Sequence, residues 1–274
     1  MKKIEKILLI SLFYSINLQS SVKKQEVIFA NTQNILLAGS LSSQPDKPHK
    51  TCIIMTHGAA NDRTANGLFT DLIPTLLPYG DVLNFDMSGH GKRQDAIFHL
   101  EQSVDDVKAA IKFCKHHGYT ESILIGHSLG GYASLAAYDS SVKAIILLGA
   151  LSGAAPAAFS WKNFCSPEQL TAMERSGYMI IPCEGSTRPY VHYRSDYAPD
   201  TQTINQEQLF KNIAIPILFI NGTEFPESVF ADLAQKAVLL ATPGSKTIVI
   251  PHATHSFLES IAQLQVHITE WLKA

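Results

Sequence analysis

A serine stands between two glycines in the stretch GHSLG at 126–130, which follows the apolar run at 123–125 and precedes a helix-forming segment. The pattern Gly-x-Ser-x-Gly between a strand and a helix is typical of a nucleophile elbow, a sharp turn that exposes the serine hydroxyl. The glycines have a steric purpose, because only residues without a side chain let the strand and the helix approach closely around the serine. The alternative is a structural turn that contains a serine. We predict that Ser128 is a nucleophile.

A serine hydroxyl needs a neighbouring base to become an effective nucleophile. His255 lies in the short loop "PHATHSF" after the last predicted strand, and it follows the serine along the chain as the elbow arrangement requires. His252, in the same loop, is the alternative base. His127 and His90 lie inside turn motifs and are expected to be structural. We predict that His255 takes the proton from Ser128.

Acyl transfer also needs hydrogen-bond donors for the negative charge that develops on the carbonyl oxygen. The backbone N–H of Leu129 follows the serine directly and lies at a predicted helix N-terminus. The second donor is expected in "THGAAND", the loop after the strand at 51–56, where Ala59 follows His57-Gly58. The alternative for His57-Gly58 is an ordinary turn at the end of a strand. The backbone amides of Ala59 and Leu129 are therefore the predicted oxyanion hole.

The elements that must position these residues alternate along the chain between strands and helices. An antiparallel hairpin is predicted at 25–30 and 35–40, because two strand-like runs flank a short polar turn. The remaining predicted elements are strands at 51–56, 81–85, 121–126, 142–149, 215–220 and 247–250, and helices at 66–78, 103–117, 129–139, 227–240 and 256–272. This alternation predicts an α/β fold, with a mostly parallel central sheet and helices on both faces. In such sheets functional groups gather outside the carboxyl ends of the strands, where the predicted site residues lie.

Residues 153–212 interrupt this alternation with a stretch rich in proline, tyrosine and polar residues. We interpret them as a small inserted cap, with possible strands at 177–182 and 190–194. The alternative is a long irregular loop, which is uncommon at this length in a compact domain. The cap aromatics could shape a substrate pocket or simply pack the cap: Trp161, Phe164, Tyr178, Tyr190, Tyr193 and Tyr197. We expect the cap to govern substrate choice more than the chemistry.

Five motifs occur in an order that resembles the α/β-hydrolase superfamily across residues 24–274: "MTHGAANDR", "NFDMSGHG", "IGHSLGG", "LFINGTE" and "ATHSF". The chain is similar to bacterial carboxylesterases of the cinnamoyl/feruloyl-esterase and monoacylglycerol-lipase type, which carry a small cap at the position of 153–212. The resemblance implies a serine hydrolase that cleaves small-molecule carboxylic esters through an acyl-enzyme, without a cofactor. It implies Ser128 as nucleophile, His255 as base and the amides of Ala59 and Leu129 as oxyanion hole. It also implies that Asp86 holds a turn rather than taking part in catalysis.

One position departs from that family, which commonly places its acid in a Gly-x-x-Asp turn after the strand equivalent to 215–220. The corresponding stretch of this chain, "GTEF" at 222–225, has Phe225 where the aspartate would stand. Glu224 is adjacent to the expected position, and its additional methylene could offset the change of register. Glu227 follows Pro226 and would fit the first turn of the next helix, where it would favour the helix dipole. We predict Glu224 as the acid, with Glu227, or no acid at all, as the alternatives.

The N-terminus has the composition of a secretory signal. Three lysines at positions 2, 3 and 6 precede an apolar stretch at 7–16, and Ser20-Ser21 follow. We predict that residues 1–22 are a signal peptide, that 23–274 form the hydrolase domain, and that the protein is exported to the periplasm or beyond. The apolar stretch is too short for a stable membrane span. The alternative is an ordinary first element of a cytoplasmic protein.

The remaining composition gives weaker constraints. With a net charge of −2 over 274 residues, the chain has no electrostatic reason to bind nucleic acid. Cys52 and Cys114 are expected to be buried thiols, and Cys165 and Cys183 are the expected disulfide pair if the protein is exported. No cysteine or histidine spacing indicates a metal site. Alternative functions on the same fold are a serine peptidase, a thioesterase, or a binding protein that has lost catalysis.

Overall fold

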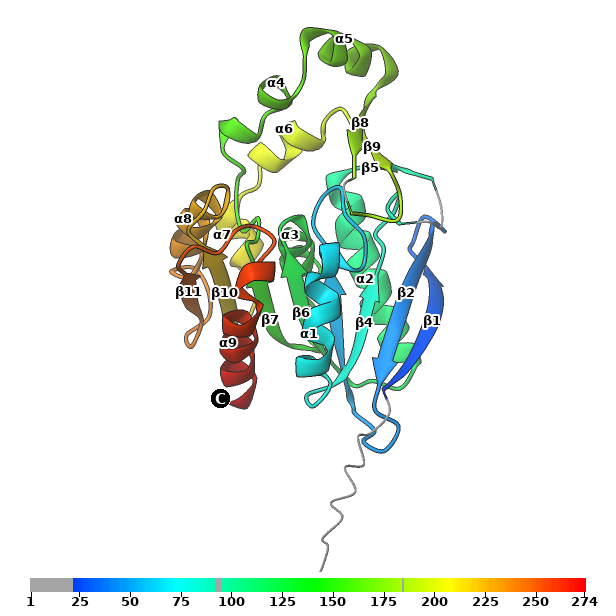
Figure 1. Cartoon of the computed structure of the whole chain (residues 1–274), viewed down its shortest axis with the longest axis vertical. Coiled ribbons are helices and arrows are strands. Elements are labelled where there is room, and N and C mark those ends of the chain that lie inside the picture. Colours follow the sequence, from blue (N-terminus) through cyan, green and yellow to red (C-terminus); the bar gives the residue numbers. More distant parts are fainter. Residues whose placement is uncertain (1–21, 92–94, 184) are drawn as a thin grey trace, which may run out of the picture.

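An eight-stranded sheet forms the centre of the part of the chain that the computed structural model describes, residues 22–91, 95–183 and 185–274 (Figure 1). Its strand order is β1-β2-β4-β3-β6-β7-β10-β11. The bounds are β1 Lys23–Ala30, β2 Leu36–Ser43, β3 Thr51–Thr56, β4 Asp81–Phe85, β6 Glu121–His127, β7 Val142–Leu148, β10 Ile217–Gly222 and β11 Lys246–Ile250. The β1–β2 hairpin and the β2–β4 pair are antiparallel, and the other pairs are parallel. The predicted α/β fold and its hairpin are confirmed.

Helices cover both faces of this sheet, as the alternating pattern predicts (Figure 1). They are α1 Leu68–Leu76, α2 Leu100–His116, α3 Leu129–Ala136, α8 Glu227–Ala237 and α9 Ile261–Lys273. Apolar side chains of α1 and α9 pack in one core, and those of α2, α3 and α8 pack in the core on the opposite face. Strands β3 and β4 are buried along their whole length, because helices lie on both sides of them. The last helix begins five residues later than predicted, since a 3₁₀ turn occupies Leu258–Ser260.

Most of the predicted cap segment, 153–212, lies above the carboxyl ends of the strands, whereas its last helix packs beside α3 (Figure 1). Its elements are η2 Ala157–Phe159, α4 Trp161–Phe164, α5 Pro167–Ser176, β8 Tyr178–Pro182, β9 Tyr190–Arg194, α6 Tyr197–Gln202 and α7 Gln206–Phe210. Both strands predicted in this segment are therefore present. They form an antiparallel hairpin, and β9 also pairs with β5, Ile97–Phe98, from the main domain. The small sheet β5-β9-β8 thus joins the cap to the loop that precedes α2.

The disulfide differs from the prediction. Cys52 of β3 is bonded to Cys114 of α2, with their Cα atoms 6.3 Å apart, whereas Cys165 and Cys183 are free. The predicted Cys165–Cys183 pair is wrong, and so is the prediction of free thiols at 52 and 114. The pairing arises because α2 packs directly against β3, which brings together two buried side chains that are 62 residues apart in the chain. Helix α5 and strand β8 lie between Cys165 and Cys183 in the chain.

The predicted signal peptide lies outside the described residues, apart from Val22. Among the described residues, no helix has both the length and the apolar character needed to cross a bilayer.

Candidate active site

Ser128 occupies the turn between β6 and α3 with a strained backbone, at φ 54° and ψ −120°. Residues other than glycine rarely adopt a positive φ, and such strain persists only where the surrounding structure enforces it. The flanking glycines explain how the turn fits. A Cβ at Gly126 would collide with the Gly130 carbonyl, and a Cβ at Gly130 would collide with the carbonyl of Thr56 on β3. The local structure is therefore the strand-elbow-helix turn that the Gly-x-Ser-x-Gly pattern predicts.

His255 lies in the loop after β11 and is held by a buried glutamate. Its Nδ1 is 2.5 Å from Oε1 of Glu227, a side chain that is 0% exposed in the first turn of α8. The other carboxylate oxygen, Oε2, accepts the backbone N–H of Gly222 at 2.9 Å. Gly149, at the end of β7, makes room for this carboxylate, because a Cβ there would overlap Glu227 Oε1. The carboxylate is thus fixed at both oxygens, which orients the imidazole of His255.

The predicted contact between Glu224 and His255 is wrong. Glu224 Oε1 lies 3.5 Å from Nδ1 of His252, whose side chain is 92% exposed. The reason is the turn at 223–226, in which the N–H of Glu227 bonds to the carbonyl of Glu224 at 2.6 Å. This turn places the first residue of α8 against His255 and leaves Glu224 half exposed beside His252. In the sequence, Glu227 stands directly after Pro226 at the start of a predicted helix. This position is the sequence signal for the acid that contacts His255 in the structure.

The other histidines near the turn motifs are buried. His127 Nε2 donates to the backbone carbonyl of His255 at 2.8 Å, and the two rings lie 4.6 Å apart, so that His127 supports the loop that carries His255. His57 Nδ1 donates to the Gly58 carbonyl, and its Nε2 accepts the N–H of Met87 at 3.1 Å. Burial lowers the pKa of His127 to about 3 and that of His57 to about 4. Both rings are therefore neutral at neutral pH and serve as structural links.

These buried histidines predict a loss of stability in mild acid. The folded-state pKa values of His57, His90 and His127 all lie below 6.5, so the unfolded chain takes up protons first and stability falls as the pH falls below 6.5. Asp86 and Asp106 act in the opposite direction, because burial raises the pKa of each to about 6. We expect the free energy of unfolding to fall by about 2 to 4 kcal/mol between about pH 7 and about pH 5. Urea titrations at the two pH values measure it, and greater stability at the lower pH would contradict the prediction.

Ser128 and His255 line the same cavity of about 430 Å³, together with the predicted oxyanion residues Ala59 and Leu129. Within the described residues, the N–H of Ala59 has no hydrogen-bond partner. The N–H of Leu129 begins α3 and is one of the donors that a helix leaves without an internal acceptor. The described residues show no direct hydrogen bond between Ser128 and His255, a contact that often tightens only when substrate binds.

The cap closes this cavity with aromatic side chains, among them Phe159, Tyr193 and Tyr197. Tyr178 and Tyr190 instead pack their rings on His192. The side chains of Trp161 and Phe164 lie outside the described part of the structure.

A second cavity, of about 470 Å³, lies between α2, α3, α6 and α7 and does not include Ser128 or His255. In the described ranges, no group of three or more His, Cys, Asp and Glu side chains could hold a metal ion.

Comparison with known proteins places the chain in a family. A sequence model of the alpha/beta hydrolase family matches residues 53–264, and the chain belongs to this family. A search of curated protein sequences found no match.

Solved structures share the fold at low sequence identity. One is a thermophilic esterase from Thermogutta terrifontis, with a TM-score of 0.65 and 19% identity, over 91% of this chain and 98% of that chain. Another is Est1E from Butyrivibrio proteoclasticus with bound ferulic acid, with a TM-score of 0.67 and 19% identity, over 90% and 98%. A third is DcsB in complex with its substrate analogue, with a TM-score of 0.74 and 16% identity, over 92% and 99%.

Proposed function

We propose that this protein is a serine hydrolase that cleaves small-molecule carboxylic esters through an acyl-enzyme. Ser128 is the nucleophile, His255 the general base and acid, and Glu227 the residue that orients His255. The amides of Ala59 and Leu129 form the oxyanion hole. The observation that carries the proposal is the convergence of Ser128 and His255 on one cavity, with His255 bonded on its far side to the buried Glu227.

Each residue has one task in this mechanism. His255 accepts the proton as Ser128 Oγ attacks the carbonyl carbon, and it then returns that proton to the leaving alcohol. Glu227 accepts the Nδ1–H of His255, which keeps Nε2 free as a base and stabilises the imidazolium that forms. The two backbone amides bind the oxyanion of the tetrahedral intermediate. Water then attacks the acyl-enzyme by the same route and regenerates Ser128.

An ester is the substrate class that the lining of the Ser128 cavity favours. Among the described residues, the cavity is lined by no Asp, Glu, Lys or Arg, and its side chains are mostly aliphatic or aromatic, which suits an uncharged apolar acyl or aryl group. Two similar structures are described as an esterase and as a protein with bound ferulic acid, which supports the same class. The reading of a hydrolase that has lost catalysis depended on a missing acid, and the Glu227–His255 contact removes that support.

A substrate panel tests this proposal. The purified protein should hydrolyse p-nitrophenyl esters of graded chain length, and a fluorophosphonate probe should label it. Matched thioester and peptide-anilide substrates distinguish the thioesterase and peptidase alternatives, and both should turn over more slowly than the best ester. Faster turnover of either would assign the site to that reaction, whereas neither ester turnover nor labelling would contradict a serine hydrolase.

We further propose that the protein is exported and that residues 1–22 act as its signal. The basic and apolar order of this segment supports export. The disulfide between Cys52 and Cys114 also supports it, because such bonds persist mainly in oxidising compartments.

A further inference from the structure

The loop after β3 carries the Ala59 amide on a backbone that needs external support. The residue after Ala59, Ala60, has a φ of 51°, in the left-handed region that favours glycine. A non-glycine residue remains there only when neighbouring groups hold it. The contacts of residues 57–63, which we call the oxyanion loop, therefore decide where the Ala59 N–H lies.

Tyr193 of the cap strand β9 contacts the residue that follows Ala59. Its hydroxyl oxygen accepts the N–H of Ala60 at 2.7 Å and lies 3.0 Å from Nε2 of His90. The direction of the second bond follows from His90, whose Nδ1 lies 2.9 Å from the Ser88 carbonyl, a group that can only accept. The proton of His90 is thus on Nδ1, and Nε2 accepts from the hydroxyl of Tyr193. Burial, which lowers the pKa of His90 well below its ordinary value, keeps the ring in this neutral form.

This chain of bonds is buried, so water does not compete for it. Tyr193 is 1% exposed, and His90 is 2% exposed. The Tyr193 ring packs edge-on against Phe98 and Tyr197 at centroid distances of 5.2 and 4.6 Å. A hydroxyl in this position both accepts from Ala60 and donates to His90, so it links the oxyanion loop, the cap and the turn after β4.

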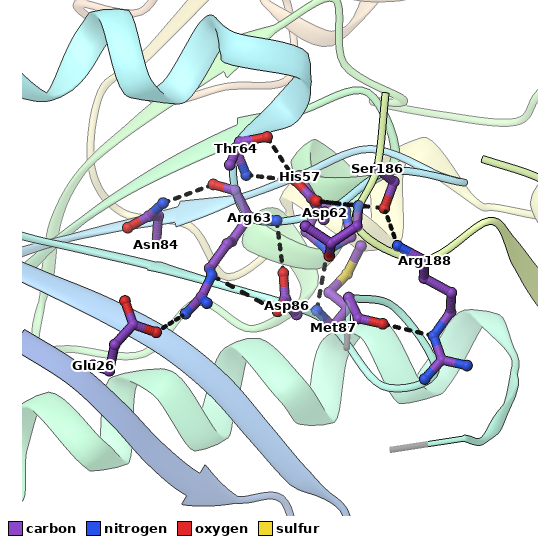
Figure 2. A network of polar contacts seen from close by, with 12 residues as sticks. Glu26, His57, Asp62, Arg63, Thr64, Asn84, Asp86, Met87, Ser186 and Arg188 are labelled. Carbon is purple, nitrogen blue, oxygen red and sulfur yellow. Dashed lines mark hydrogen bonds and ion pairs between the residues drawn. The ribbon is translucent and has the colours of Figure 1, made fainter. Parts of the chain in front are cut away.

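Asp62 provides a second link between the oxyanion loop and the cap (Figure 2). Its Oδ2 accepts the N–H of Thr187, from the loop between β8 and β9, at 2.8 Å, and its Oδ1 accepts the N–H of Thr64 at 2.9 Å. Burial would raise the pKa of Asp62, but the hydrogen bonds from Thr64 and Thr187 outweigh it and hold the pKa below its usual value. The carboxylate is therefore ionised when it bridges the two segments.

The opposite side of the oxyanion loop is attached to the main domain (Figure 2). The N–H of Arg63 donates to Asp86 after β4 at 2.8 Å, and His57 accepts the N–H of Met87. Arg188 of the cap also donates to the Gly91 carbonyl at 2.6 Å. The main domain therefore holds the two ends of the loop, and the cap holds its middle, where Ala60 and Asp62 lie.

We propose that the β8–β9 hairpin supports the oxyanion hole from outside, with Tyr193 and Asp62 as positioning residues that hold the oxyanion loop so that the Ala59 N–H faces Ser128. The inference rests on the proposed serine hydrolase function. It extends the role of the cap from substrate choice to the chemical step. It also assigns to Ala60 a fixed partner, so that its amide does not act as an oxyanion donor.

The test is Tyr193→Phe, which removes the hydroxyl and keeps the ring. We expect kcat for a p-nitrophenyl ester to fall by about 10- to 100-fold, with KM within about 2-fold, because a displaced oxyanion donor weakens only the transition state. The inhibition constant of a trifluoromethyl ketone, which forms an oxyanion on Ser128, should rise by about the same factor. Tyr190→Phe is the matched control, since Tyr190 lies on the same strand but is 44% exposed and packs on His192, and it should behave as wild type.

Two further measurements make the result decisive. Asp62→Asn should lower kcat in the same direction, and it decides the question if Tyr193→Phe does not fold. Amide hydrogen exchange at residues 58–62 should be faster in Tyr193→Phe than in Tyr190→Phe. Wild-type kcat and ketone affinity in the folded Tyr193 variant, or a change in KM alone, would overturn the proposal. Failure of the wild type to hydrolyse any ester would instead defeat the proposed function, and hydrogen exchange would still test the contact with Tyr193.

Discussion

Ser128→Ala should lower ester turnover by about five to six orders of magnitude, the effect expected when a triad nucleophile is removed. The variant keeps the oxyanion donors and the cavity, so it should still bind substrate, but no hydroxyl remains to form the acyl-enzyme. Steady-state kinetics on a p-nitrophenyl ester measure the loss. Labelling by a fluorophosphonate probe, followed by mass spectrometry of the modified peptide, locates the nucleophile directly.

Ser152→Ala is the control for this substitution. Ser152 is buried four residues after β7 ends. It lies close to the elbow, because the N–H of its neighbour Leu151 bonds to the Ser128 carbonyl at 3.0 Å. Its Oγ has no hydrogen-bond partner in the described structure, so its removal should leave activity near that of wild type. Continued probe labelling of Ser128→Ala would show that another residue is the nucleophile.

Glu227→Gln should lower kcat by about three to four orders of magnitude with little change in KM. The amide keeps the size of the side chain, but it cannot stabilise an imidazolium as a carboxylate does. It can also present its NH₂ group to His255 Nδ1, which would favour the tautomer with the proton on Nε2, where the base must be free. Glu227 is 0% exposed, so water cannot easily replace the lost interaction.

Glu224→Gln provides the matched comparison, because the same substitution is made three residues earlier in the same turn. Glu224 is half exposed and lies beside His252, so we expect its variant to keep nearly full activity. Thermal unfolding of both variants separates a folding defect from a catalytic one. A larger loss of kcat in Glu224→Gln than in Glu227→Gln would contradict the geometry of the site.

Local sequence patterns were sufficient for the elements and for several of the site residues. The Gly-x-Ser-x-Gly stretch predicts the elbow at Ser128 because the steric requirement is met within five residues and two neighbouring elements. The alternating pattern predicts strands at 51–56 and 81–85 in a sheet with helices on both faces, and the structure buries both strands, β3 and β4, fully. The chain position of His255, in a short loop after the last strand, places it at the same sheet edge as Ser128, since parallel strands end on one side.

The tertiary structure decided the features that depend on contacts between distant segments. Nothing near Glu227 in the sequence shows that Gly149 leaves space for its carboxylate. The sequence therefore favours Glu224, which is adjacent to the position of the family's aspartate. The same holds for the disulfide, because only the packing of α2 on β3 brings Cys52 to Cys114.

The contacts of the oxyanion loop show the same difference between what a local sequence pattern predicts and what tertiary packing decides. The sequence by itself determined the fold, through its alternation of strands and helices. It also predicted Ser128, His255 and the amides of Ala59 and Leu129 as site residues, because each follows from a short pattern next to a strand. The hydrogen-bond partners of these segments were decided only by folding. Glu227 is the partner of His255, and Tyr193 is the partner of the amide of Ala60, the residue after Ala59. The physical reason is that a hydrogen bond acts over about 3 Å. Its partner is therefore set by which segments meet in space, here 133 residues apart for Ala60 and Tyr193, and not by their order in the chain.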